Sequence, residues 1–394
     1  MFALLVLFNI YCLWRIFRYM KKISSRLNHL TLFVTIGILF VVMSVFLLLG
    51  ALLPYSSIRT FFHIISNYWL GFFIEFVTFT LLVDLIMLVV KLVNRFHPVA
   101  FLHKPIDYGV RLTLIFVLSL GCTVYGAIHA EHLYTNSYEA EVSKDANGVE
   151  DLNIVVMGDL HLGYSVGLKE MQAMVDSVNA LNPDIIILAG DAFDNEYEAI
   201  AEDQEIIETL QGLKSKYGLY ATWGNHDVTE TLVGGFPVTN GDGAMRDPRM
   251  TQFLTDCGFT LIEDDTLLID NSFYLIGRKD TERAGDGTKN RKTIEELTQD
   301  LDASLPWIVI NHEPDELDET AAVGADLSLS GHTHAGQFFP LTIVQPFRWK
   351  NHWGCKQFDQ LWAYTTSGVG VYGPPLRIAT DAEIMQIQVH FTGK

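Results

Sequence analysis

Hydrophobic and polar positions divide the 394 residues of the chain into two parts with different patterns. Before residue 131 the apolar residues form long unbroken runs, and after it they form short runs separated by polar, glycine-containing turns. A run of about 20 apolar residues can cross a bilayer as a helix, whereas short runs are typical of buried strands. We therefore expect a transmembrane helical region at residues 1–130, followed by a folded α/β part.

Three apolar runs approach or exceed the length of a membrane-spanning helix: 30–53, 69–90 and 112–130. A fourth run, residues 1–14, is shorter and either spans the membrane or lies in its interface. A cleaved signal peptide carries its positive charge before the apolar stretch, whereas here the charge follows it, so we expect this run to be retained. The region is predicted to contain 3 or 4 spans.

The basic residues of the connecting segments predict the orientation. Segment 15–29 carries five Lys and Arg and segment 91–111 carries four, whereas segment 54–68 carries only Arg59. Cytoplasmic loops are enriched in Lys and Arg, so the first two segments should be cytoplasmic. The chain is then a multi-pass protein of the cell membrane, and residues 131–394 lie outside the cytoplasm, in the periplasm if an outer membrane is present.

Two acidic residues interrupt the 69–90 run, and both are costly in lipid. We expect Glu75 to lie near the outer interface and Asp84 to pair inside the helix bundle.

The second part of the chain alternates short apolar strands with helical patterns. Strands are predicted at 153–157, 185–189, 219–223, 273–277, 307–311 and 327–330. Helices are predicted near 167–181, 198–216, 246–257 and 292–302. An acidic connector with a first strand, residues 131–152, precedes them and contains a turn signal at Asn147-Gly148. The domain boundaries are thus expected at 1–130, 131–152 and 153–394.

Charge separates the two parts as sharply as hydropathy does. Residues 1–130 carry 10 Lys and Arg against 3 Asp and Glu, a balance of +7, and residues 131–394 carry 17 against 43, a balance of −26. Such an acidic part repels polyphosphate backbones, which argues against a nucleic-acid partner. Four cysteines exclude a disulfide scaffold and leave Cys257 and Cys355 as the one possible pair in the acidic part.

Five polar clusters follow predicted strands directly. They are Gly-Asp-Leu-His at 158–161, Gly-Asp-Ala-Phe-Asp at 190–194, Gly-Asn-His-Asp at 224–227, Asn-His-Glu at 311–313 and Gly-His-Thr-His at 331–334. In open α/β sheets ligand sites form beyond the carboxyl ends of strands, so the clusters can converge on one crevice. Carboxylates, imidazoles and an amide without thiolates suit divalent Mn, Fe or Zn in a site that is not a structural zinc module.

In these five clusters residues 153–391 resemble the calcineurin-like metallophosphoesterase family, whose blocks follow D-x-H, G-D-x-x-D, G-N-H-D, H and G-H-x-H. The stretch 331–337 and the ending Ser367-Gly-Val-Gly with Pro375-Leu-Arg resemble its membrane-tethered branch, which includes phospholipid-type hydrolases. Ala335 stands where that branch usually has a second glycine. The resemblance implies an α/β domain built as a two-sheet β sandwich flanked by helices.

The resemblance also implies a dinuclear metal site. One divalent ion would be held by Asp159, His161, Asp191 and His334, and the other by Asp191, Asn225, His312 and His332. Two such ions lower the pKa of a bridging water, whose hydroxide attacks the ester, and clamp the phosphoryl oxygens. His226 would approach the substrate, with Asp227 orienting it, while Asp194 would fix a metal ligand by hydrogen bonding.

A basic, aromatic segment, residues 338–364, directly follows the last of these histidines. Phe338, Phe339 and Arg348 are our candidates for substrate contacts, with rings against acyl chains or the bilayer interface and the cation against a phosphate headgroup. The alternative is that half of the aromatic rings of this segment fill the core beneath the second sheet. A second basic run, 278–293, is expected to be a solvated loop.

The sequence therefore predicts a membrane-anchored phosphoesterase with two divalent metal ions, acting on a phosphorylated lipid or lipid-linked substrate. A soluble nucleotide, a sugar phosphate or a phosphoprotein is the alternative substrate. A catalytically silent membrane receptor is a third reading, disfavoured because every ligand position of the motifs is present. The sequence leaves the oligomeric state open.

Overall fold

The computed structural model describes residues 2–23, 30–96, 107–233, 236–237 and 243–393. The chain divides into two compact units, residues 1–127 and 128–394.

The first unit is helical, as its apolar runs predict. Its helices are α1 (Phe2–Ile23), α2 (Leu30–Leu52), α3 (Ser57–Phe96) and α4 (Tyr108–Ala130), whose last turn belongs to the second unit. Among the described residues three helices, α2, α3 and α4, are long and apolar enough to cross a membrane. α3 has 40 residues and runs through most of the predicted 54–68 loop, so it is longer than one span requires. Arg26 and Lys104, from the two basic segments, lie outside the described residues.

The acidic residues of α3 have different surroundings. Asp84 forms an ion pair with Arg15 of α1 and accepts a hydrogen bond of 2.5 Å from the Tyr11 hydroxyl, as expected of a charge inside an apolar bundle. Glu75 is buried within the unit, and its place near the outer interface stays a prediction.

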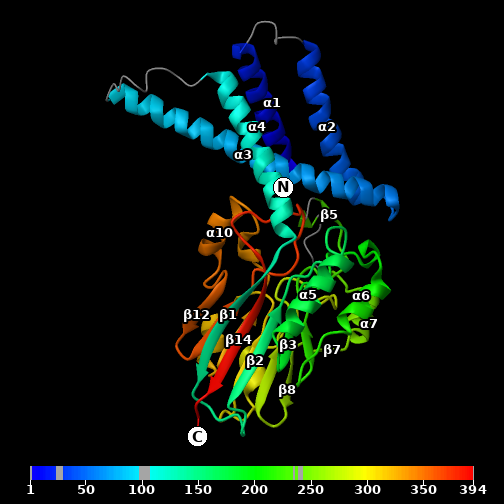
Figure 1. The fold of residues 1–394 in the computed structure, drawn as a ribbon, viewed down its shortest axis with the longest axis vertical. Helices are drawn as coiled ribbons and strands as arrows, with labels where there is room; N and C mark the ends of the chain where they lie inside the picture. The colour runs from blue at the N-terminus through cyan, green and yellow to red at the C-terminus, as the bar shows by residue number, and fades with distance from the viewer. Residues whose placement is uncertain (1, 24–29, 97–106, 234–235, 238–242, 394) are drawn as a thin grey trace. The chain divides into compact units, whose positions relative to one another are not determined.

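The second unit is built on two six-stranded sheets (Figure 1). The first sheet has the order β1 (Leu133–Val142), β14 (Ala382–Phe391), β2 (Asp151–Met157), β3 (Ile185–Ala189), β4 (Leu219–Thr222) and β7 (Phe259–Leu261). The second has the order β12 (Gly354–Phe358), β13 (Leu361–Thr365), β11 (Leu327–Ser330), β10 (Trp307–Ile310), β9 (Phe273–Gly277) and β8 (Asp265–Ile269). A small separate ribbon pairs β5 (Leu232–Val233) with β6 (Phe236–Pro237).

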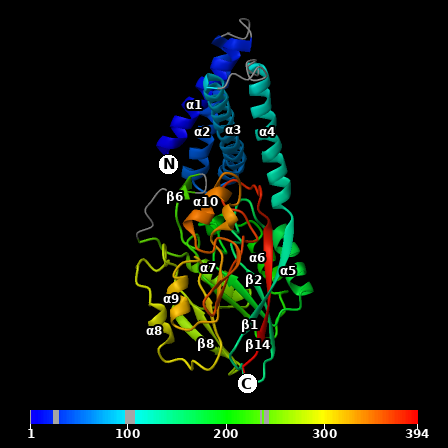
Figure 2. The same ribbon diagram turned by 90° about the vertical axis from the view of Figure 1, so that its left-hand side faces the viewer.

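The sheets face each other and helices cover their outer sides, which confirms the predicted sandwich. Apolar residues of β2 and β3 meet those of β10 and β11 in the layer between the sheets. Helices α5 (Leu168–Ala180), α6 (Asp203–Leu210) and α7 (Pro248–Asp256) pack on the first sheet, and α8 (Ile294–Thr298) and α9 (Leu317–Ala322) pack on the second. Figure 2 shows α5 and α6 on one side of the paired sheets and α8 and α9 on the other. Strands with a continuous apolar run, such as Ile185–Ala189, are those covered on both faces.

The six predicted strands are all present. The strands of the two sheets that periodicity did not reveal are β7, β8 and β12 at sheet edges, and β13 and β14, each one position inside an edge. The Asn147-Gly148 turn does not join a hairpin, because β1 pairs with β14 and not with β2. Cys257 and Cys355 are free thiols. Cys257 directly follows α7, which packs on the first sheet, and Cys355 lies in β12 of the second sheet.

Within each sheet, the strands that precede the polar clusters run in the same direction, so their carboxyl ends lie at the same edge of the sheet. β2, β3 and β4 are parallel in the first sheet, and β9, β10, β11 and β13 are parallel in the second. β14 is antiparallel to β2, and β1 is parallel to β14. Consequently β1 and β14 begin at the edge of the first sheet where β2, β3 and β4 end.

Candidate metal centre

The five polar clusters occupy the loops that follow β2, β3, β4, β10 and β11. Their ligand-type side chains form three groups whose nitrogen and oxygen atoms lie within 4.8 Å of one another. The groups are Asp159, His161 and His334; Asp191, His312 and His332; and His161, Asp194 and His226. The structure thus brings together residues up to 175 positions apart in the chain, as the motif order predicts.

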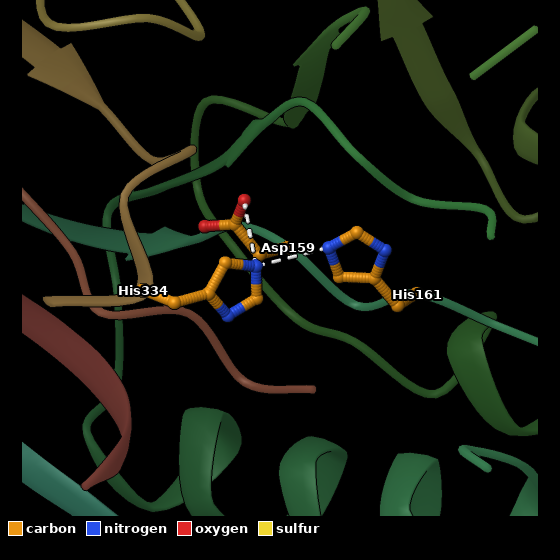
Figure 3. Close-up of side chains that lie close together, drawn as sticks. All are labelled: Asp159, His161 and His334. Carbon is orange, nitrogen blue, oxygen red and sulfur yellow. Dashed lines mark hydrogen bonds and ion pairs between the residues drawn. The ribbon is translucent and has the colours of Figure 1, made fainter. Parts of the chain in front are cut away.

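The first group contains one carboxylate and two imidazoles (Figure 3). The Nε2 atoms of His161 and His334 are 3.0 Å apart, and His334 Nε2 lies 3.6 Å from Asp159 Oδ1. All three side chains are almost completely buried. Two imidazole nitrogens and a carboxylate facing one point form a ligand set suited to a divalent metal.

The second group adds an amide oxygen. His312 Nε2 lies 3.1 Å from Asp191 Oδ2 and 3.2 Å from Asn225 Oδ1, and His332 Nδ1 lies 2.9 Å from the same amide oxygen. His312 Nδ1 is 2.7 Å from the carbonyl oxygen of Ala189, to which it donates. That hydrogen bond holds the proton on Nδ1 and leaves Nε2 with a free lone pair for a metal.

Asp191 lies between the two groups. Its Oδ2 is 3.8 Å from His161 Nε2 on one side and 3.1 Å from His312 Nε2 on the other. Its Oδ1 accepts a hydrogen bond of 2.7 Å from the backbone N–H of His226, which fixes the carboxylate. This geometry is the one expected of a carboxylate shared by two cations.

The backbone of the site is held in an uncommon conformation. Asp159, His161, Asp191, His332 and His334 all have φ between 49° and 70°, in the left-handed region that non-glycine residues rarely adopt. Such conformations cost about 1–3 kcal/mol each and persist where the surrounding structure enforces them. Their concentration in the candidate ligands marks this edge as a functional site.

The space between the ligands requires a glycine at position 224. A Cβ atom there would lie 2.2 Å from Asp191 Oδ1 and 2.7 Å from His312 Nε2. Any side chain would therefore fill the region on which the ligand atoms converge.

The third group differs in its chemistry, because one carboxylate faces two imidazole Nδ1 atoms. Asp194 Oδ1 lies 3.4 Å from His226 Nδ1 and 3.6 Å from His161 Nδ1. Because the Nε2 of His161 faces the first group, Asp194 is placed to hold the Nδ1 proton of that ring. The same carboxylate also faces the Nδ1 atom of His226.

Asp227 was predicted to orient His226, but both of its oxygens lie against backbone groups. Oδ1 accepts from the N–H of Phe193 at 2.9 Å, and Oδ2 accepts from the N–H of Gly224 at 2.7 Å. The carboxylate therefore ties the loop after β4 to the loop after β3. In this geometry Asp194, not Asp227, is the neighbour of the His226 ring.

Burial sets the direction of the pKa shift at Asp159, His332 and His334. At Asp191 and His312 the opposite charges of their neighbours outweigh the effect of burial on the pKa. Burial raises the pKa of Asp159 to about 6, with Asp191 adding to the effect and His312 opposing it. Burial also lowers the pKa of His332 and His334 well below the usual value, with help from the neighbouring histidines His312 and His161 respectively. Neutral imidazoles are the form that binds a metal, and a cation beside Asp159 would favour its charged form. The donor set thus fits two divalent cations.

The candidate substrate residues divide between core and surface. Phe338 is only 4% exposed, Phe339 is half-buried, and Arg348 is exposed, with an ion pair of 3.6 Å to Glu282. The Trp349 ring lies 5.2 Å from the ring of metal-site residue His332. The segment after His334 therefore forms part of the rim of the site, while Phe338 packs in the interior.

Three further residues at the site, Tyr372, Arg283 and Arg377, were not among the predicted site residues. The Tyr372 ring lies 4.9 Å from the ring of His334 and 5.9 Å from the rings of His161 and His226. Arg283 donates from Nη1 to the carbonyl oxygen of Asn225 at 3.2 Å.

Arg377 is the third of these residues and is completely buried. Its Nη2 donates to the carbonyl oxygens of Ser367, Gly368 and Gly370 at 2.7, 3.0 and 2.6 Å and lies 3.3 Å from His334 Nδ1. The sequence motifs noted above contain both partners of this contact. Ser367-Gly-Val-Gly supplies the carbonyl groups, and Pro375-Leu-Arg supplies the guanidinium.

The prediction of a solvated loop at 278–293 is wrong in part. Arg278 is buried, and with Arg291 and Lys292 it lines a cavity of about 370 Å³. Its guanidinium is paired with Glu316 at 2.9 Å. The apolar strand β9 carries Arg278 directly into the interior, where the ion pair offsets the cost of burying its charge.

Comparison of the sequence with known proteins finds similarity to metallophosphoesterases, as the ligand set of the candidate metal centre would suggest. Residues 152–336 match the family model described as calcineurin-like phosphoesterase. A Danio rerio protein named "Transmembrane protein with metallophosphoesterase domain" is 30% identical over 70% of this chain, and a Bos taurus protein of the same name is 27% identical over 73%. The "Uncharacterized metallophosphoesterase YkuE" of Bacillus subtilis is 28% identical over 64% of this chain and 83% of its own length. The alignments cover 61% and 64% of the zebrafish and bovine proteins.

Proposed function

We propose that this chain, whose residues 152–336 form a calcineurin-like phosphoesterase domain, is a membrane-anchored hydrolase of phosphate esters that works with two divalent metal ions. The observation that carries the proposal is Asp191, whose Oδ2 lies between His161 Nε2 and His312 Nε2. Manganese, iron and zinc all suit the ligand types.

The metal ions, when bound, lower the pKa of water and neutralise charge on the phosphoryl oxygens. Asp159, His161, Asp191 and His334 would hold one ion, and Asp191, Asn225, His312 and His332 the other. The protein's part is to hold these donors in place through the Ala189 carbonyl and the Asp194 carboxylate.

His226 would handle the proton of the leaving oxygen. Its Nδ1 faces Asp194 at 3.4 Å, and although burial lowers its pKa, the carboxylates of Asp191 and Asp194 raise it above the ordinary value. A protonated ring can donate from Nε2 to a departing alkoxide. Asp227 acts indirectly by fixing the loop that carries His226.

The substrate is proposed to be a lipid or a lipid-linked phosphate ester. The support is the set of apolar helices in the same chain, together with rings and the exposed Arg348 that follow the ligand His334. Phe339 and Arg348 would contact the substrate, while the contribution of Phe338 would be to pack beneath them. A soluble phosphate ester is the alternative, favoured if the same enzyme hydrolyses it without a lipid tail.

The test is the metal content of the purified full-length chain. We expect about two transition-metal ions per chain, and Asp191→Asn should lower the occupancy of both sites because one carboxylate serves both cations. The matched control is Asp256→Asn, since Asp256 is an exposed aspartate at the end of α7. Near-stoichiometric occupancy by two ions in an Asp191→Ala protein would overturn the bridging assignment.

A further inference from the structure

Helix α10 (Leu341–Arg348) exposes its apolar side chains in place of burying them. Phe347 is 86% exposed, Ile343 55% and Val344 54%, and no residue of the helix is buried. A short helix on a globular domain normally packs an apolar stripe on the core. The exposed set, named here the α10 face, comprises Ile343, Val344 and Phe347. A contiguous exposed apolar patch of this kind marks an interaction surface.

The α10 face lies at the rim of the metal centre. The short helix η4 (His334–Gly336), which carries a candidate ligand, leads into α10 after four residues. Trp349, directly after α10, has its ring 5.2 Å from that of His332. Whatever covers the α10 face is therefore held beside the site where the ester would bind.

The same edge of the domain is where the chain arrives from its apolar helices. Two residues separate the end of α4 from Leu133, where β1 begins, and β1 starts at the edge where β2, β3 and β4 end. Glu383 connects the segment after α10 with β1. Its carboxylate accepts hydrogen bonds from Trp353 Nε1 at 3.2 Å and from Asn136 Nδ2 of β1 at 2.5 Å. Because β1 follows an apolar helix of membrane-spanning length in the chain, a lipid bilayer is favoured over a soluble protein as the partner that covers the α10 face.

Charge supports the same occupant. Residues 131–394 carry a balance of −26, so most of the domain surface is repelled by anionic lipid. The α10 face ends in Arg348, and Lys350 follows it; both are exposed and are paired at the surface with Glu282 and Asp318 respectively, which a headgroup phosphate would have to displace. Apolar side chains flanked by cations fit the headgroup and upper acyl layer of a bilayer.

We propose that the α10 face inserts into the surface of the lipid bilayer and thereby holds the metal centre at the headgroup layer. The inference deepens the proposed function and rests on it, since it states that the substrate is taken from the bilayer surface and not from water. The ligand class is a phosphate ester carried on an acyl-chain anchor.

The first test measures the depth of the face in the full-length chain. A nitroxide label on Phe347→Cys, in a chain with Cys122 and Cys355 changed to Ser, is placed in vesicles of phosphatidylcholine and phosphatidylglycerol. We expect the label to be reached by oxygen dissolved in the lipid and shielded from a water-soluble nickel complex. The matched control is a label on Glu208→Cys, which is exposed on α6 and should remain in water. Equal access of the nickel complex to both labels would overturn the proposal.

The second test separates docking from catalysis. In the Val344→Ser/Phe347→Ser variant, turnover of a long-chain phosphodiester in vesicles should fall about tenfold or more, since the two lost apolar burials together weaken docking by at least that factor. Turnover of bis(p-nitrophenyl) phosphate and metal content should be unchanged. Equal turnover of the vesicle substrate by variant and wild type would refute docking, whereas a wild-type protein that hydrolyses neither ester would refute the proposed function instead.

Discussion

His226 is distinguished from the other histidines of the site by what its ring faces. Its Nδ1 lies beside the Asp194 carboxylate, and its ring is 4.9 Å from that of His161. His312 and His332, in contrast, both approach the Asn225 amide oxygen. The residue-scale geometry therefore favours a proton-handling role for His226 and a ligand role for the others.

The substitution His226→Ala should reduce turnover by about 10²–10⁴, because it would remove the group that we propose protonates the leaving oxygen. Metal content should stay near the wild-type value. Steady-state kinetics on a soluble phosphodiester, with elemental analysis of the same sample, measures both. If the variant loses metal in proportion to activity, His226 is a ligand and the assignment fails.

At the scale of an element, the loop between β13 and β14 depends on one buried side chain. Arg377 donates to three carbonyl groups of this loop, and burial lowers its pKa to about 10. Gly370 of the loop passes so close to Leu160 that a Cβ would lie 2.0 Å from its carbonyl oxygen. Tyr372, which borders the candidate ligands, is carried by the same loop.

Arg377→Met is expected to lower the free energy of unfolding by about 3–5 kcal/mol, because three buried carbonyl groups lose their shared donor. Thermal unfolding of the purified chain provides the measurement. Arg249→Met is the matched control, because Arg249 is half-exposed and its pairs with Asp247 and Glu198 are worth about 0–1 kcal/mol. Similar losses in the two variants would show that the carbonyl clamp contributes little.

The aromatic segment 338–364 contains both buried and exposed rings. Phe338 is buried near η4, whereas Phe347 projects from α10. Phe338→Ser should lower the free energy of unfolding by about 3–5 kcal/mol, as expected for the loss of a buried ring. Phe347→Ser should change it by less than about 0.5 kcal/mol. Chemical denaturation of both variants measures the difference, and an undamaged Phe338→Ser protein would return that ring to the candidate substrate contacts.

For the whole molecule, the charge balance predicts the side on which the catalytic unit lies. The basic segments 15–29 and 91–111 favour the cytoplasm, so the acidic part is expected outside it. The orientation decides which lipid leaflet and which soluble esters the site can meet.

A cysteine at Glu150 reports this orientation, because Glu150 is exposed beside the 147–148 turn and avoids Gly148, whose φ is +91°. In a Cys355→Ser background, Glu150→Cys should react with a membrane-impermeant thiol reagent in intact cells, or in spheroplasts if an outer membrane is present. Protection of the thiol until the inner membrane is opened would reverse the topology.

The sequence by itself determined the helical and α/β parts and the set of candidate ligands. Long apolar runs define helices through local composition, and polar residues directly after apolar strands predict a site at the strand ends. These signals depend on neighbouring residues in the chain. For that reason the strands at 153–157 and 185–189 and the motif around Asp191 could be read without coordinates.

Only the tertiary structure decided which residues act together. Asp194 instead of Asp227 lies beside His226 because two loops from separate strands meet there. Arg278 is buried although its segment is basic, since it extends an interior strand and has Glu316 as its partner. Strand β14, which lies between β1 and β2, and the exposed α10 face have no distinctive local pattern. Their roles follow from pairing and packing between distant segments, which the hydrophobic period of a single segment does not encode.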